Sequence, residues 1–145
     1  EAKRIAEELK LKLAEAKRVA LEIEMKEAEL KQSALEAKTK EAELLVEEIY
    51  KQLTTAYVNN IAARVKTFWR YQAAEDDWTC EVYVIQDRQG QVKAVDVRNC
   101  NVGNSSLAKS FRDSIERAVY KASPLPVAPD EAVFDKEIII TFRVN

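Results

Sequence analysis

The first 48 residues constrain the fold most, because they contain no aromatic residue, glycine, proline or cysteine. This segment is built almost entirely from Ala, Glu, Lys, Arg and Leu, which favour helix and are typical of long helices. It therefore predicts a long helix that adds little to a globular core. We expect a helical stalk or spacer at residues 1–48 and a globular domain at residues 49–145.

The expected stalk carries charges at helical spacing. Glu22 with Lys26 and Glu27 with Lys31 are pairs of the i,i+4 type, which stabilise a helix weakly. The apolar residues keep no a/d seam over three or four heptads. We therefore expect a solvated helix that acts as a spacer, about 70 Å long at ~1.5 Å per residue. A coiled coil is the alternative.

Apolar residues recur every three or four positions from residue 49 to residue 68, which predicts an amphipathic helix packed on a core. This helix is expected to end near Tyr71. Trp69 lies off the apolar stripe and is expected to be exposed. A second apolar stripe at residues 107–122 predicts another helix, with an N-cap supplied by residues 104–106.

Three segments alternate apolar and polar residues, as half-buried strands do. They are residues 78–85, 92–97 and 137–144, and a Gly-containing turn at 87–90 joins the first two into a hairpin. The second segment changes phase once, which predicts a bulge near residues 93–94. The order helix, strand, strand, helix, strand predicts an α+β fold of two layers, a three-stranded antiparallel sheet with helices on one face.

The composition argues against several classes of function. The net charge is −2 with acidic and basic residues intermixed, whereas nucleic-acid binding needs a basic patch. The chain has no histidine and two cysteines, too few ligands for a zinc site and no base for a nucleophilic cysteine. A Gly-rich phosphate loop is also missing. We expect no enzyme activity, metal, cofactor, nucleic acid or small-molecule substrate.

The two cysteines flank the predicted hairpin. Cys80 lies at the start of the first strand and Cys100 just past the end of the second. They are therefore either two buried thiols or one disulfide. An antiparallel hairpin brings these ends together, and a suitable register would place the Cα atoms ~4.4 to 6.8 Å apart, which favours the disulfide. Closing a loop of about twenty residues would stabilise the domain by ~3 kcal/mol and would imply an oxidising compartment.

A three-stranded sheet leaves two edges, and an open edge is a template for strand addition. If the last strand pairs with the first, the sheet order is 2-1-3 and the edges are residues 91–98 and 137–144. The last strand has no internal proline, so its edge is weakly protected. We expect a partner to bind there, with Ile139, Thr141 and Arg143 placed to meet it. Coverage of this edge by a loop or helix is the alternative.

The final segment, ASPLPVAPDEAVFDKEIIITFRVN, resembles the end of the TonB/TolA C-terminal domains. In that family a helix is followed by a Pro-containing segment, a Phe and a strand of the form I-x-x-T-F-R. The hairpin with a Cys at each end resembles the TolA type, as does the Ala/Glu/Lys-rich helix that leads into the domain. The TonB type usually carries a Pro-rich spacer in that place.

The resemblance implies a disulfide between Cys80 and Cys100 and β-addition to an edge strand. It implies a non-enzymatic periplasmic protein, anchored to the inner membrane by an N-terminal segment absent from this fragment. That protein would work with TolQ and TolR, bind TolB and Pal, maintain outer-membrane integrity and aid division. Group A colicins and filamentous phage would use such a domain for entry. Two alternatives are a TonB-type energy transducer for outer-membrane transporters and a structural coiled-coil protein with a capping domain.

Overall fold

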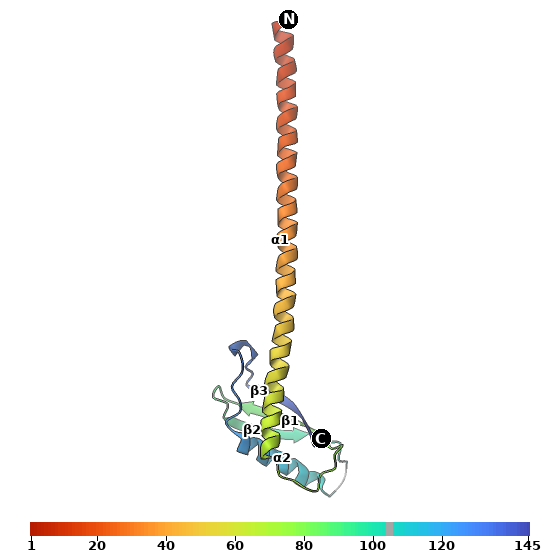
Figure 1. Ribbon diagram of the computed structural model, residues 1–145, viewed down its shortest axis with the longest axis vertical. Coiled ribbons are helices and arrows are strands. Elements are labelled where there is room, and N and C mark those ends of the chain that lie inside the picture. The colour runs from red at the N-terminus through yellow and green to blue at the C-terminus, as the bar shows by residue number, and fades with distance from the viewer. Residues whose placement is uncertain (104–105) are drawn as a thin grey trace. The chain divides into compact units, whose positions relative to one another are not determined.

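The computed structural model describes residues 1–103 and 106–145. The predicted α+β order of helix, strand, strand, helix, strand is confirmed (Figure 1). By contacts between Cα atoms the chain divides into two compact units, residues 1–47 and residues 48–145. The elements are α1 (Ala2–Phe68), β1 (Thr79–Gln86), β2 (Val92–Arg98), α2 (Ala108–Ala122), the 3-10 turn η1 (Glu131–Val133) and β3 (Glu137–Arg143).

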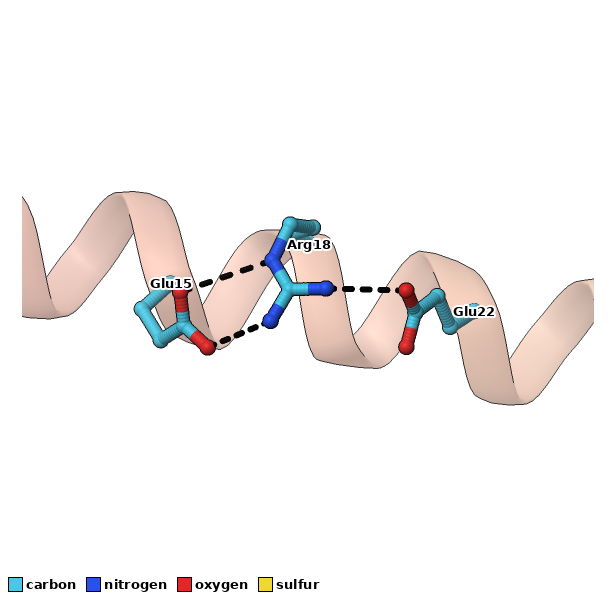
Figure 2. A network of polar contacts seen from close by, with 3 residues as sticks. All are labelled: Glu15, Arg18 and Glu22. Atoms are coloured by element: carbon cyan, nitrogen blue, oxygen red, sulfur yellow. Dashed lines mark hydrogen bonds and ion pairs between the residues drawn. The ribbon is translucent and has the colours of Figure 1, made fainter.

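The first unit consists of the N-terminal part of α1, in which every residue is exposed. Its side chains stabilise the helix locally. Arg18 lies between Glu15, one turn before it, and Glu22, one turn after it, and its guanidinium donates hydrogen bonds to both carboxylates (Figure 2). Exposed pairs of this kind contribute only ~0.3 to 0.5 kcal/mol each, so many of them are needed to hold a helix that packs on no core.

The last turns of α1 pack on the core of the second unit. Tyr57, Ile61 and Val65 are at most 1% exposed and lie four residues apart, as the apolar stripe predicted. The prediction that this packing begins at Ile49 is wrong, since 46% of Ile49 is exposed and the core includes no residue of α1 before Leu53.

The sheet has the predicted order β2-β1-β3, and both pairings are antiparallel. The central strand β1 therefore has a partner on each side. Ile85 pairs with Ala94 while Gln86 pairs with Val92, so Lys93 is an extra residue in β2. This confirms the predicted bulge. A bulge bends a strand and interrupts its ladder of hydrogen bonds.

Alternation along the strands separates a buried face from an exposed face of the sheet. Alternate residues of β1 and β3 are buried, and they share one core with the packed faces of α1 and α2. Burial of these apolar side chains supplies most of the driving force for folding, at about 25 cal/mol per Å². The central members of the core are Tyr57, Ile61, Val65, Val82, Val84, Phe111, Ile115, Val119, Ile140 and Phe142.

Two element ends differ from the predictions. α1 ends at Phe68, three residues before the expected Tyr71. The N-cap of α2 is Leu107, which makes no side-chain capping hydrogen bond, so the prediction of a cap from residues 104–106 is wrong. Residues 104 and 105 themselves lie outside the described residues. Burial of its apolar face against the core holds the helix in place.

The Pro-rich connection to β3 is anchored at two points. Arg64 Nε donates to the carbonyl oxygen of Ala122 at 2.7 Å, which holds the end of α2 against α1. Leu125 N–H donates to the Gly90 carbonyl at 2.8 Å. A Cβ atom at Gly90 would lie 2.6 Å from the Leu125 oxygen, so only glycine fits at this hairpin turn. These contacts fix the path of the chain that leads into β3.

Candidate partner-binding edge

Cys80 and Cys100 form a disulfide, with Cα atoms 4.1 Å apart. The alternative of two buried thiols is therefore not the arrangement in this structure. The chain reverses after β2 through Asn99, whose φ of 55° lies in the left-handed region that Asn tolerates. Asn101 then accepts a hydrogen bond from Thr79 N–H at 2.8 Å through its side chain. The open end of the hairpin is thus held by both a covalent bond and hydrogen bonds.

The phase of hydrogen bonding along β3 determines which backbone groups face outward. Val144 N–H donates to the Trp78 carbonyl, and Gln86 N–H donates to the Lys136 carbonyl. Residues of an antiparallel strand alternate between bonding to the neighbour and facing away from it. The even-numbered residues of β3 therefore bond to β1, while Ile139, Thr141 and Arg143 direct their N–H and C=O groups to the outer edge.

These three residues are the ones that the sequence predicted for partner contact. The outward N–H groups of Ile139, Thr141 and Arg143 have no hydrogen-bond partner among the described residues. Their side chains are exposed on the open face of the sheet, and Ile139 is 58% exposed although it is apolar. The structure thus brings together free backbone groups and an exposed apolar side chain on one short edge.

A groove of about 420 Å³ runs beside this edge. Its other wall is the last part of α1, where small or short side chains leave room. Along this groove the space between α1 and β3 is open. The lining residues are Val58, Asn59, Ala62, Ala63 and Lys66 of α1 and residues 139–143 of β3.

The two edge strands of the sheet, β2 and β3, differ in how well they are protected against strand addition. At the start of β3, Glu137 N–H donates to Asp135 Oδ1 at 3.0 Å, which limits the open edge to residues 139–143. The other edge strand, β2, has its bulge at Lys93, and Val92 N–H donates to Ser123 Oγ at 3.1 Å. Bulges and caps of this kind discourage strand addition. The β3 edge is therefore the more accessible of the two.

The open face of the sheet also carries a polar cluster. Hydrogen bonds from Asn99 Nδ2 and the Tyr83 hydroxyl, each 2.9 Å long, lower the pKa of the Glu81 carboxyl. The same bond to Glu81 raises the pKa of Tyr83. The Arg98 guanidinium lies 4.0 Å from the centroid of the Tyr83 ring, in a cation–π contact. This cluster orders β1 and β2 next to the β3 edge.

Trp69 is half-buried against β3, so the prediction that it is exposed is wrong. Its ring is 5.1 Å from that of Phe142 in β3, and its Nε1–H donates to Ser114 Oγ at 2.9 Å. Because α1 ends at Phe68, the helical phase used for the prediction no longer applies at Trp69. A signal was present in Ser114, a polar residue on the apolar stripe of α2 that needs a partner once buried.

Within residues 1–103 and 106–145, no group of three or more His, Cys, Asp or Glu side chains could hold a metal ion. No helix in the described part of the chain is both long enough and apolar enough to span a membrane.

The fold is a small α+β domain in which one edge strand, β3, lies beside an open groove. The TonB C-terminal family model matches residues 54–142, more than half of the chain, and the chain belongs to this family. The resemblance of its sequence to the TonB/TolA C-terminal domains is confirmed at that level. The family consists of cell-envelope proteins that act in the periplasm through protein–protein contacts and is not a family of enzymes. No curated protein matches the sequence.

Proposed function

We propose that this chain is the TolA type of the family, a periplasmic part of the Tol-Pal system that is anchored to the inner membrane. Its C-terminal domain binds TolB and Pal, and it works with TolQ and TolR to maintain outer-membrane integrity and to aid division. Colicins and filamentous phage would use the same domain for entry. Two features support the TolA type: the 67-residue helix without proline and the disulfide between Cys80 and Cys100.

The mechanism we propose is strand addition to β3. The observation that carries it is the row of outward backbone groups at Ile139, Thr141 and Arg143, beside an open groove. A partner segment in extended conformation would continue the sheet through main-chain hydrogen bonds. Such binding needs no catalytic group, and its specificity depends on the side chains that flank the edge.

The test is capture of TolB and Pal from a Gram-negative periplasmic extract on the immobilised chain, read by mass spectrometry. Ile139→Pro and Thr141→Pro each remove one outward donor without removing a bond to β1, and we expect both to weaken capture at least tenfold. Val95→Pro is the matched control, because Val95 is the corresponding outward residue on β2, and it should leave capture unchanged. Unchanged affinity in both β3 variants would count against strand addition there.

The match to the TonB C-terminal model favours a second candidate, an energy transducer for outer-membrane transporters. The same experiment separates the two. Capture of a transporter through its N-terminal peptide, with no TolB or Pal, would support the transducer. A stable oligomer in light scattering without any captured partner would instead support a structural coiled-coil protein whose domain caps the stalk.

A further inference from the structure

The β3 edge has opposite charges at its two ends. Asp135 and Glu137 lie at its start with Lys136 between them, and Arg143 lies at its end. Lys66 of α1 lines the groove together with Arg143. Lys66 and Arg143 are both exposed, and no carboxylate of the described residues lies within ion-pair distance of either cation. One end of the edge therefore carries two carboxylates against one cation and is acidic in net charge, and the other end is cationic, with no ion-pair partner among the described residues.

Two contacts show that Lys66 lies toward the Arg143 end. The Tyr57 hydroxyl accepts a hydrogen bond from Gln86, the residue that bonds to Lys136 just before β3. Twelve residues further along the chain, Trp69 packs on Phe142 near the end of β3. The last part of α1 thus runs in the same direction as β3, and Lys66 lies beside the end of the strand.

An added strand would present its side chains alternately to the groove and to the open face of the sheet. The groove side meets Val58, Ala62 and Ala63, which suit apolar side chains. On the open face the added strand meets Ile139 and Arg143, which are four residues apart. The partner positions that face these two side chains are therefore also four residues apart.

We propose that the β3 edge selects an extended partner segment with an apolar residue against Ile139 and an acidic residue, four positions away, against Arg143, with Lys66 adding positive charge at the same end of the edge. The inference rests on the strand addition proposed above and adds the chemistry of the partner. A segment placed the other way would set its acidic residue beside Glu137 and Asp135, and like charges there would disfavour it. The charges at the edge thus define both the register and the orientation of the bound segment.

Three capped nine-residue peptides with Thr at the odd positions and Val at the even positions test this inference on the full chain, since a Val then lies four positions from the charge at position 2 or 8 on the same face. The first has Glu at its second position and Lys at its eighth, the second has these two exchanged, and the third has Gln at both. Isothermal titration calorimetry measures their affinities. We expect one charged peptide to bind about threefold to tenfold more tightly than the Gln peptide at low salt, as exposed ion pairs allow. Which one binds more tightly shows whether the segment adds parallel or antiparallel to β3.

The variant Lys66→Gln/Arg143→Gln should abolish the advantage of the charged peptide and leave binding of the Gln peptide unchanged. Arg117→Gln/Lys121→Gln is the matched control, because it removes two exposed cations from α2 and changes the net charge equally. A charged peptide that keeps its advantage in the β3 variant, or that binds no better than the Gln peptide, overturns the inference. Failure of all three peptides to bind at millimolar concentration overturns it as well.

The outcomes also separate this inference from the proposed function. If Ile139→Pro weakens the Gln peptide but charge order has no effect, strand addition stands and only the charge selection fails. If Ile139→Pro leaves all peptide binding unchanged, the peptides bind elsewhere, and strand addition at β3 fails with it. Adding 0.5 M NaCl gives an independent readout, since it should remove most of the charge-dependent advantage and little of the binding of the Gln peptide.

Discussion

Helical structure is stabilised in different ways in residues 1–47 and in residues 48–145. The first unit is exposed along its whole length and relies on helix propensity and on local pairs such as Glu15, Arg18 and Glu22. The second unit contains the end of α1 and buries it against α2 and the sheet. The same helix, α1, therefore draws on local interactions in one region and on burial in the other. A substitution should cost little in the first region and much in the second.

The two regions can be followed by separate signals. Both tryptophans, Trp69 and Trp78, lie in the second unit, so intrinsic fluorescence reports that unit alone. Far-UV circular dichroism reports helix content, to which residues 1–47 contribute heavily. Unfolding followed by the two signals should give transitions that do not coincide, which is the test for departure from two-state behaviour.

The largest expected effect is truncation of a core aromatic. Phe111 is fully buried and its ring contacts those of Trp69, Trp78 and Phe142. Phe111→Ala should lower the free energy of unfolding of the second unit by about 3 to 5 kcal/mol, because it leaves a cavity. Urea unfolding followed by fluorescence measures this. The matched substitution Leu21→Ala, at a residue 57% exposed, should stay within about 0.5 kcal/mol, and equal effects would contradict the comparison.

Loss of the disulfide should come next. Cys80 and Cys100 are 20 residues apart in sequence. Cross-linking a loop of that length stabilises a domain by about 3 kcal/mol in the chain-entropy model. We expect Cys80→Ala/Cys100→Ala to lower the free energy of unfolding of the second unit, followed by fluorescence, by about 3 kcal/mol. The circular dichroism signal of the helix in residues 1–47 should not change. If oxidised and reduced protein unfold at the same midpoint, the bond does not stabilise the second unit.

One substitution made in both regions sharpens the comparison further. Ala118→Gly in α2 removes a buried methyl group and costs helix propensity, for a loss of about 2 kcal/mol. Ala20→Gly in the exposed part of α1 costs propensity alone, about 1 kcal/mol, and only local helix content should fall. Fluorescence should detect the first change and circular dichroism the second. A shift of the fluorescence midpoint by Ala20→Gly would show that the two units unfold together.

The smallest expected effect is loss of the Arg18 pairs shown in Figure 2. Arg18→Ala should remove ~0.3 to 0.5 kcal/mol for each pair, seen as a slight fall in helix content at low salt. At 1 M NaCl the difference from the unchanged protein should nearly vanish, because salt screens exposed charges. Arg18→Lys keeps the charge and should show a smaller fall. A fall in helix content that persists in high salt would contradict the ion-pair explanation, and helix propensity would not account for it, because Ala favours helix at least as strongly as Arg.

Much of the fold could be predicted because its strands alternate clearly. In residues 138–143 one face is wholly apolar and the other is Ile139, Thr141 and Arg143, and the structure buries the wholly apolar face. The bulge at Lys93 followed from a single change of phase in β2. The errors at Trp69 and the N-cap of α2 lie at element ends, and the error at Ile49 lies inside α1, next to the boundary between the two units. There the periodicity stops, and contacts from distant residues decide the position of the side chain.

The candidate edge was only partly predictable. Alternation placed Ile139, Thr141 and Arg143 on one face, but the outward direction of their backbone groups depends on pairing with β1. That pairing joins segments more than fifty residues apart, and no local pattern encodes its phase. The groove and the place of Lys66 depend on how α1 docks, which the sequence of α1 alone does not determine.

The sheet order β2-β1-β3 has a consequence for the order of assembly. The hairpin of β1 and β2 closes through a short turn. The pairing of β1 with β3 closes a longer loop, because α2 and the Pro-rich connection lie between β2 and β3 in the sequence. Closing the longer loop costs more entropy and is slower. We expect the hairpin to form first and its cysteines to meet an oxidant before β3 docks. During that interval the edge of β1 is itself open, and a β3 segment from a second chain could occupy it in a domain swap.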